Sequence, residues 1–188
     1  MLYGGYPVAA YRGVARLHAG RYNAPMATTD HTFSYCCRTE QDTDALAAAL
    51  APLLQPGDII LLDGDLGAGK TRFVQGVAAA LGIREPVTSP TFTIHVVYQG
   101  ELPINHFDLY RLDSEDELDD IGYWEVLEGD GASFVEWADK FPDSAPADCI
   151  TMNLSVGDSN MRTAAMSAHG PRSAQLLDAW EASIVSAS

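Results

Sequence analysis

The sequence has little positive charge. Its 188 residues include 11 lysines and arginines against 26 acidic residues, giving a formal net charge of −15, and its two lysines are Lys70 and Lys140. A surface of this sign repels a phosphate backbone, so unaided binding of DNA or RNA is not expected. Any role that involves a nucleic acid is therefore predicted to be indirect.

Cysteine and long apolar runs are also scarce. The three cysteines form neither a disulfide framework nor a CxxC metal pair, a usage that fits reduced cytosol. The five histidines show no metal-ligand spacing. No uninterrupted apolar run approaches the ~20 residues that a membrane-spanning helix needs. We therefore expect a cytoplasmic protein that does not contact a membrane.

The N-terminal end differs from the rest of the chain. The first 29 residues contain three arginines and no acid, and they lack the continuous apolar segment of a secretory signal. We expect residues 1–30 to be a disordered N-terminal extension, with Met26 as the true start. The length suits one domain with its own core, and we assign that domain to residues 31–188.

Strand and helix patterns are mixed along residues 31–188, which predicts an α/β fold. Thr39 and Asp42 form a capping-box pattern, and Ser114 is the predicted N-cap of a later helix. The apolar segment within 56–64 is typical of a strand buried on both faces, and 91–100 with 102–112 is predicted to be a hairpin. The other expected strands are 32–36, 132–141, 149–156 and 161–168, and the helices are 39–50, 70–81, 114–127 and 170–185.

The segment "GDLGAGKT", residues 64–71, fits the phosphate-loop pattern G-x-x-x-x-G-K-[ST] at every position. Its glycines allow successive backbone amides to point at phosphates, the Lys70 ammonium would reach the β- and γ-phosphates, and the Thr71 hydroxyl would bind Mg²⁺. Because a buried strand precedes the loop and an amphipathic helix follows it, we predict a P-loop NTPase-like three-layer sandwich with a mixed parallel/antiparallel central sheet. The nucleotide-binding residues predicted from the loop are Asp65, Leu66, Gly67, Ala68, Gly69, Lys70 and Thr71.

Two acids stand at the ends of apolar strands, Asp108 and Glu136. A carboxylate there would hold Mg²⁺ or orient an attacking water, although a solvated acid at a strand end has the same pattern. The hydroxyls of Thr88, Ser89 and Thr91 would suit a loop that senses the γ-phosphate, and a plain turn is the alternative. The sequence alone leaves these alternatives open.

Missing motifs narrow the class of protein. None of the asparagines is followed by lysine, so the N-K-x-D guanine-recognition motif is absent and ATP is favoured over GTP. No arginine-rich lid segment is evident, which weakens the alternative of a P-loop kinase for a small metabolite. A small, weak ATPase or an ATP-dependent switch remains.

Four segments in this order, "PGDIILLDGDLGAGKT", "VTSPTFTI", "HFDLYRL" and "FVEWADK", resemble the TsaE (YjeE) family of bacterial tRNA threonylcarbamoyladenosine biosynthesis ATPases. The resemblance spans residues 33–168. Arg72 departs from it, because the family usually has a second threonine or another small residue there. This departure is not expected to affect phosphate binding.

The resemblance implies a weak or partner-stimulated Mg²⁺-dependent ATPase that supports threonylcarbamoylation of adenosine 37 in tRNA. The partners would be the TsaB–TsaD pair, which would contact the tRNA. By position, the implied catalytic residues are Lys70, Asp108 and Glu136, and the implied Mg²⁺ ligands are Thr71 and Glu136. Trp137 would lie close to the nucleotide, with Glu40 and Thr43 as weaker candidates near the adenine.

Overall fold

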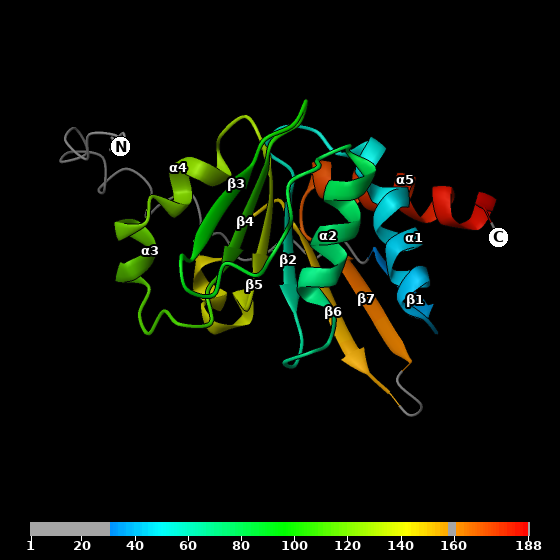
Figure 1. Ribbon diagram of the computed structural model, residues 1–188, viewed down its shortest axis with the longest axis horizontal. Coiled ribbons are helices and arrows are strands. Elements are labelled where there is room, and N and C mark those ends of the chain that lie inside the picture. Colours follow the sequence, from blue (N-terminus) through cyan, green and yellow to red (C-terminus); the bar gives the residue numbers. More distant parts are fainter. Residues whose placement is uncertain (1–30, 158–160, 188) are drawn as a thin grey trace.

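The computed structural model describes residues 31–157 and 161–187, and the expectation of a disordered extension over residues 1–30 lies outside this part. Seven strands form one sheet in the order β1-β7-β6-β2-β5-β4-β3 (Figure 1). The strands are β1 (Thr32–Cys37), β2 (Ile59–Asp63), β3 (His95–Tyr98), β4 (Ile104–Asp108), β5 (Ala132–Glu136), β6 (Ile150–Val156) and β7 (Arg162–Ala168). The α-helices are α1 (Glu40–Leu50), α2 (Lys70–Ala80), α3 (Asp116–Asp120), α4 (Tyr123–Leu127) and α5 (Pro171–Ala187).

The sheet is mixed, as predicted. Strand β2 pairs in parallel with both β5 and β6, and β5 pairs in parallel with β4. The other three pairings, β1 with β7, β6 with β7 and β3 with β4, are antiparallel. The last of these confirms the predicted hairpin. The carboxyl ends of β2, β5 and β4 therefore lie side by side at one edge of the sheet.

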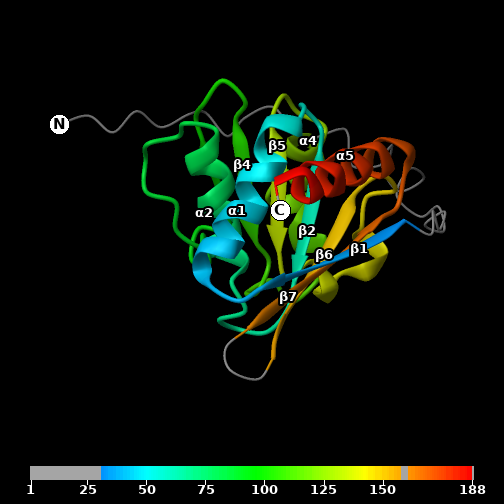
Figure 2. The same ribbon diagram turned by 90° about the vertical axis from the view of Figure 1, so that its right-hand side faces the viewer.

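Helices cover both faces of the sheet. On β2, Ile60 and Leu62 pack into the core shared with α1, α2 and α5, while Ile59 and Leu61 pack into a second core with α3 and α4. This alternation is the reason for the continuous apolar run, because a strand with two covered faces has no solvent side. Figure 2 shows α1, α2 and α5 gathered on one side of the sheet. The predicted α/β three-layer arrangement is confirmed.

Helix α5 confirms the helix predicted over 170–185; it begins at Pro171 and packs through Leu176, Leu177 and Trp180, which are all buried. The indole Nε1 of Trp180 donates to the carbonyl oxygen of Leu46 in α1 at 3.0 Å, which joins the two helices across the core. Within the described part of the chain, no helix combines the length and apolar character that crossing a bilayer requires.

Four predicted elements are shorter than expected, among them the strand predicted over 102–112, of which only Ile104–Asp108 forms β4. The predicted helix over 114–127 is two helices, α3 and α4, because Gly122 between them takes a left-handed conformation (φ 67°). Ser114 is not its N-cap: Glu115 precedes α3, and the Ser114 hydroxyl donates to the Glu117 carboxylate. Strand β3 begins only at His95, and β5 ends at Glu136, since Ile94 and Trp137 have positive φ angles of 64° and 63°.

Helices α1 and α2 approach closely at Gly76. The predicted capping box starts α1, with the Asp42 amide donating to the Thr39 hydroxyl and the Thr39 amide donating to the Asp42 carboxylate. A Cβ atom built on Gly76 would lie 2.7 Å from the Cβ of Ala47. Only glycine therefore allows α1 to lie against the helix that follows the phosphate loop.

We expect Gly76→Ala to lower the free energy of unfolding by about 1–3 kcal/mol, because the added methyl group overpacks the helix contact. Helix propensity alone predicts the opposite sign, a gain of about 1 kcal/mol. Denaturant unfolding measures the difference. Ala47→Gly removes the methyl group that the new side chain would meet, so the double variant should lose less stability than the sum of the two single variants. A Gly76→Ala chain that is more stable than wild type would contradict the packing argument.

Candidate active site

The phosphate loop connects the end of β2 to the start of α2. Gly64 opens it with a φ of 132°, and a Cβ atom there would lie 2.2 Å from the carbonyl oxygen of Leu154 in β6. No residue with a side chain can therefore occupy this position without moving β6. The loop closes onto α2 through the Phe73 amide, which donates to the Gly69 carbonyl at 2.9 Å. Its amides thus lie at the N-terminus of an eleven-residue helix, where the helix dipole favours anions.

The Lys70 side chain folds over this loop and is only 4% exposed. Its Nζ donates to the carbonyl oxygens of Gly64 and Asp65, the latter at 3.1 Å, and lies 3.8 Å from the centroid of the Trp137 ring. Burial lowers the pKa of this ammonium, and the nearby carboxylates of Glu136 and Asp108 oppose the shift. A desolvated cation beside backbone amides is suited to bind a polyphosphate.

Thr71 and Glu136 bring two hard oxygen-bearing groups together. The Thr71 hydroxyl, on the first turn of α2, donates to Oε1 of Glu136 at 2.7 Å, and Glu136 is the last residue of β5 with an exposure of 3%. Both groups are of the oxygen type that Mg²⁺ prefers, and Mg²⁺ is bound in nucleotide sites through one or two protein groups plus phosphates. The residues present therefore fit the predicted metal.

Asp108 ends β4 directly beside Glu136, since the two residues are partners in the parallel β4–β5 register. It is 2% exposed. The hydroxyls of Ser89 and Thr91 both lie 2.6 Å from its Oδ2, and the Tyr110 amide donates to its Oδ1 at 3.0 Å. The predicted hydroxyl loop thus holds this carboxylate in place, while the Thr88 amide donates instead to the Tyr98 hydroxyl.

The two left-handed residues stand next to these acids. Ile94 closes the turn that carries Thr91, with its amide donating to the Pro90 carbonyl and its own carbonyl accepting the Asp108 amide at 2.9 Å. Trp137 follows Glu136, and its amide donates to Leu62 of β2 at 3.1 Å. A left-handed conformation costs non-glycine residues on the order of 1–3 kcal/mol and is concentrated at functional sites. At Trp137 it turns the chain directly after Glu136, whereas at Ile94 it turns the chain directly before β3, beside Asp108.

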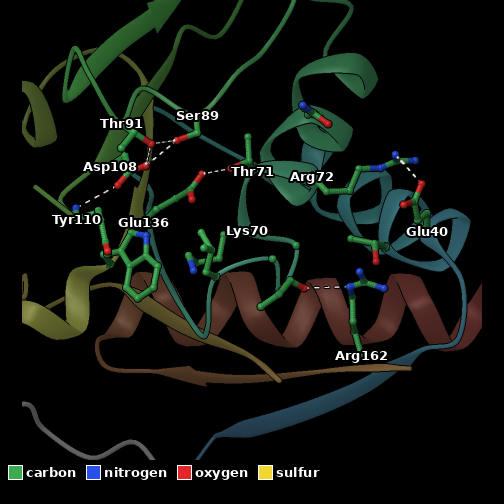
Figure 3. A pocket seen from close by; sticks show the side chains of 17 residues that line it. Glu40, Lys70, Thr71, Arg72, Ser89, Thr91, Asp108, Tyr110, Glu136 and Arg162 are labelled. Atoms are coloured by element: carbon green, nitrogen blue, oxygen red, sulfur yellow. Dashed lines mark hydrogen bonds and ion pairs between the residues drawn. The ribbon is translucent and has the colours of Figure 1, made fainter. Parts of the chain in front are cut away.

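These groups surround one cavity of about 550 Å³ (Figure 3). Asp65 does not line it, although the Asp65 carbonyl holds Lys70. Thr88 of the predicted hydroxyl loop does not line it either, whereas Ser89 and Thr91 do. The other residues that the sequence singles out as catalytic, metal-binding or nucleotide-binding all line the cavity: Glu40, Thr43, Leu66, Gly67, Ala68, Gly69, Lys70, Thr71, Asp108, Glu136 and Trp137.

The residue that departs from the family pattern, Arg72, also lines this cavity. Its guanidinium forms a two-pronged ion pair with Asp44 and a further contact with Glu40 at 3.0 Å, both on α1. The arginine therefore joins α1 to the helix of the phosphate loop. It also fixes the Glu40 carboxylate at the side of the cavity.

Sequence reasoning missed Arg162, Gln75 and Tyr110, which line the cavity as well. Arg162, the first residue of β7, donates from Nε to the Ala68 carbonyl at 3.1 Å and so supports the phosphate loop from outside (Figure 3). Nothing in the sequence distinguishes Arg162 from the other arginines of the chain, because its contact with the loop spans 94 residues.

The parallel strands, the Gly64–Thr71 loop and the helix that follows it define a P-loop NTPase-like α/β protein. The family model described as "Threonylcarbamoyl adenosine biosynthesis protein TsaE" matches residues 37–164, more than half of the chain. The chain belongs to the TsaE family, which is involved in the biosynthesis of threonylcarbamoyladenosine in tRNA.

Individual relatives support this membership. The "tRNA threonylcarbamoyladenosine biosynthesis protein TsaE" of Treponema pallidum is 42% identical over 119 residues, covering 63% of this chain and 88% of that protein. The protein of the same name from Bacillus subtilis is 41% identical over 133 residues, covering 70% and 83%. The crystal structure of Bacillus subtilis YdiB superposes with a TM-score of 0.70 at 32% identity, covering 81% of this chain and 95% of that one.

Proposed function

We propose that this chain is a Mg²⁺-dependent ATPase that supports threonylcarbamoylation of adenosine 37 in tRNA by acting on the TsaB–TsaD pair. One observation carries the proposal: Lys70, Thr71, Asp108 and Glu136, which come from three separate segments, all line the cavity beside the phosphate loop. Membership in the TsaE family supports the tRNA-modification context.

In this proposal the loop amides and the Lys70 ammonium bind the β- and γ-phosphates. Two carbonyl oxygens and the Trp137 ring already enclose the Lys70 ammonium. Its charge is therefore held beside the phosphate loop before a nucleotide binds. The Thr71 hydroxyl and the Glu136 carboxylate would hold Mg²⁺. When bound, this ion would neutralise charge on the phosphates during their transfer.

Asp108 is assigned to orienting the attacking water. Its carboxylate is held by Ser89, Thr91 and the Tyr110 amide, so its position is determined before a substrate arrives. Phosphoryl transfer depends mainly on positioning and electrostatics, and one fixed acceptor for the water is the contribution expected of a protein carboxylate here.

The charge of the chain suits a role on a protein complex in the cytoplasm rather than on tRNA itself. A formal net charge of −15 opposes direct contact with a phosphate backbone. We therefore assign contact with tRNA to TsaB–TsaD-type partners.

The proposal is tested by measuring ATP turnover of the purified chain with and without TsaB–TsaD. We expect slow release of phosphate into water by the chain alone and faster release with the partners. The alternative, a P-loop kinase of a small metabolite, predicts turnover that requires a hydroxylated acceptor, with the phosphoryl group found on that acceptor. That second result would contradict the ATPase.

A further inference from the structure

His106 lies at the centre of β4 and is completely buried (0% exposed). Its Nε2 atom is 2.8 Å from Oε1 of Glu136 on the neighbouring strand β5. Its other ring nitrogen, Nδ1, has no hydrogen-bond partner within the described part of the chain. Glu136 therefore provides the hydrogen bond that offsets the burial of this polar ring among apolar neighbours.

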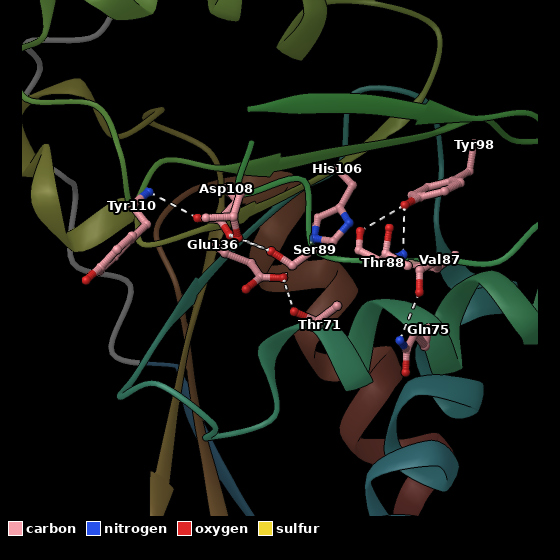
Figure 4. A network of polar contacts seen from close by, with 11 residues as sticks. Thr71, Gln75, Val87, Thr88, Ser89, Tyr98, His106, Asp108, Tyr110 and Glu136 are labelled. Atoms are coloured by element: carbon pink, nitrogen blue, oxygen red, sulfur yellow. Dashed lines mark hydrogen bonds and ion pairs between the residues drawn. The ribbon is translucent and has the colours of Figure 1, made fainter. Parts of the chain in front are cut away.

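The direction of this hydrogen bond follows from its partner. An ionised carboxylate accepts hydrogen bonds and has no proton to donate, so Nε2 of His106 carries the hydrogen. The Thr71 hydroxyl donates to the same oxygen, Oε1, at 2.7 Å. Figure 4 shows the Glu136 carboxylate between these two side chains, with Thr71 reaching it from α2 and His106 from β4.

Two fixed donors on one oxygen determine the rotation of the carboxylate. Neither hydrogen bond uses Oε2, so this second oxygen is left for the cavity that Glu136 lines. If Thr71 were the only donor, the carboxylate could rotate about its terminal C–C bond. Each time a metal bound, this rotation would be lost at a cost in entropy. Groups that hydrogen-bond to a metal-ligating carboxylate commonly have this orienting role.

We propose that His106 is a positioning residue of the site: its Nε2–H fixes the Glu136 carboxylate so that Glu136 and Thr71 present a preformed pair of Mg²⁺ ligands. This inference rests on the proposed Mg²⁺-dependent nucleotide binding. His106 touches neither substrate nor metal in this role, and it acts through Glu136 alone.

Two substitutions separate this role from simple packing. The amide nitrogen of glutamine occupies the place of Nε2, whereas that of asparagine is shorter and occupies the place of Nδ1. His106→Gln therefore retains a donor to Glu136 and His106→Asn removes it, while both bury a polar amide of the same kind. Comparing the two variants controls for the loss of the imidazole ring.

The experiment measures ADP affinity by calorimetry across a Mg²⁺ titration and again in EDTA. For His106→Asn we expect half-saturation at about tenfold higher Mg²⁺, the lower end of the effect of removing such outer contacts. The affinity in EDTA should equal that of wild type. His106→Gln should restore most of the Mg²⁺ response.

An equal loss of the Mg²⁺ response in both variants would overturn the positioning role in favour of packing. So would a loss of ADP affinity in His106→Asn that is as large in EDTA as in Mg²⁺. If both variants fail to fold, ¹⁵N NMR of the wild-type chain decides: His106 must carry a proton on Nε2, and a proton on Nδ1 alone overturns the inference. If the wild-type chain binds ADP with no dependence on Mg²⁺, the proposed function is overturned as well. If wild-type ADP binding depends on Mg²⁺ and both variants show the same Mg²⁺ dependence, only this inference is overturned.

Discussion

Replacing Lys70 by alanine is expected to reduce the affinity for MgATP about a hundredfold, since charge-assisted hydrogen bonds to two phosphates are worth roughly 3 kcal/mol together. Lys70 is buried over the loop and against Trp137, and the only other lysine of the sequence, Lys140, does not line the cavity. Isothermal titration calorimetry measures the change. In cells that depend on this chain, the same variant should reduce threonylcarbamoyladenosine in tRNA.

The other lysine is a matched control. Lys140 donates to the carbonyl oxygens of Tyr110 and Leu112 and does not line the cavity, so Lys140→Ala should leave MgATP affinity near the wild-type value. A Lys70→Ala chain that assembles with its partners and sustains normal tRNA modification would show that the chain is a nucleotide-independent scaffold. The ATPase proposal would then be wrong.

Replacing Asp108 by asparagine is expected to leave MgATP binding within about threefold of wild type and to slow hydrolysis by roughly a hundredfold, the usual effect of losing one positioned catalytic group. Asparagine keeps the shape of the side chain, and its amide can donate to the hydroxyls of Ser89 and Thr91 that now donate to Asp108. The network survives while the charge is lost. Single-turnover phosphate release, compared with calorimetric binding, separates the two effects.

Asp120→Asn provides the matching change of charge on an exposed residue of α3, away from the cavity, and should leave both quantities unchanged. If a folded Asp108→Asn chain loses ATP binding, the role of Asp108 is to bind the nucleotide or its metal and not to orient the attacking water. Hydrolysis at the wild-type rate would remove Asp108 from the reaction altogether.

Local patterns were sufficient to predict the elements that carry the phosphate loop. The continuous apolar run of β2 reflects its two covered faces, and the apolar stripe of α2 is the face that packs on the sheet. Because the loop, its strand and its helix are contiguous, Lys70 and Thr71 could be placed together from sequence. Asp108 and Glu136 could be recognised as strand-end acids, but their adjacency depends on the β4–β5 register.

The remaining features depend on contacts between distant residues. Isoleucine and tryptophan rarely adopt a positive φ, so nothing in the sequence placed turns at Ile94 and Trp137. Arg162 reaches the phosphate loop only because β7 folds back along β6, which itself pairs with β2. His106 was part of a recognised motif, yet its contact with Glu136 spans 30 residues and requires the completed sheet.

A crystal structure of the chain with a non-hydrolysable ATP analogue and Mg²⁺ tests the central claim most directly. The account predicts phosphates against the amides of residues 64–71 with Lys70 Nζ on the β- and γ-phosphates, the metal on Thr71 and Glu136, and a water between Asp108 and the γ-phosphate. A nucleotide bound elsewhere, or a metal held by neither Thr71 nor Glu136, would contradict it.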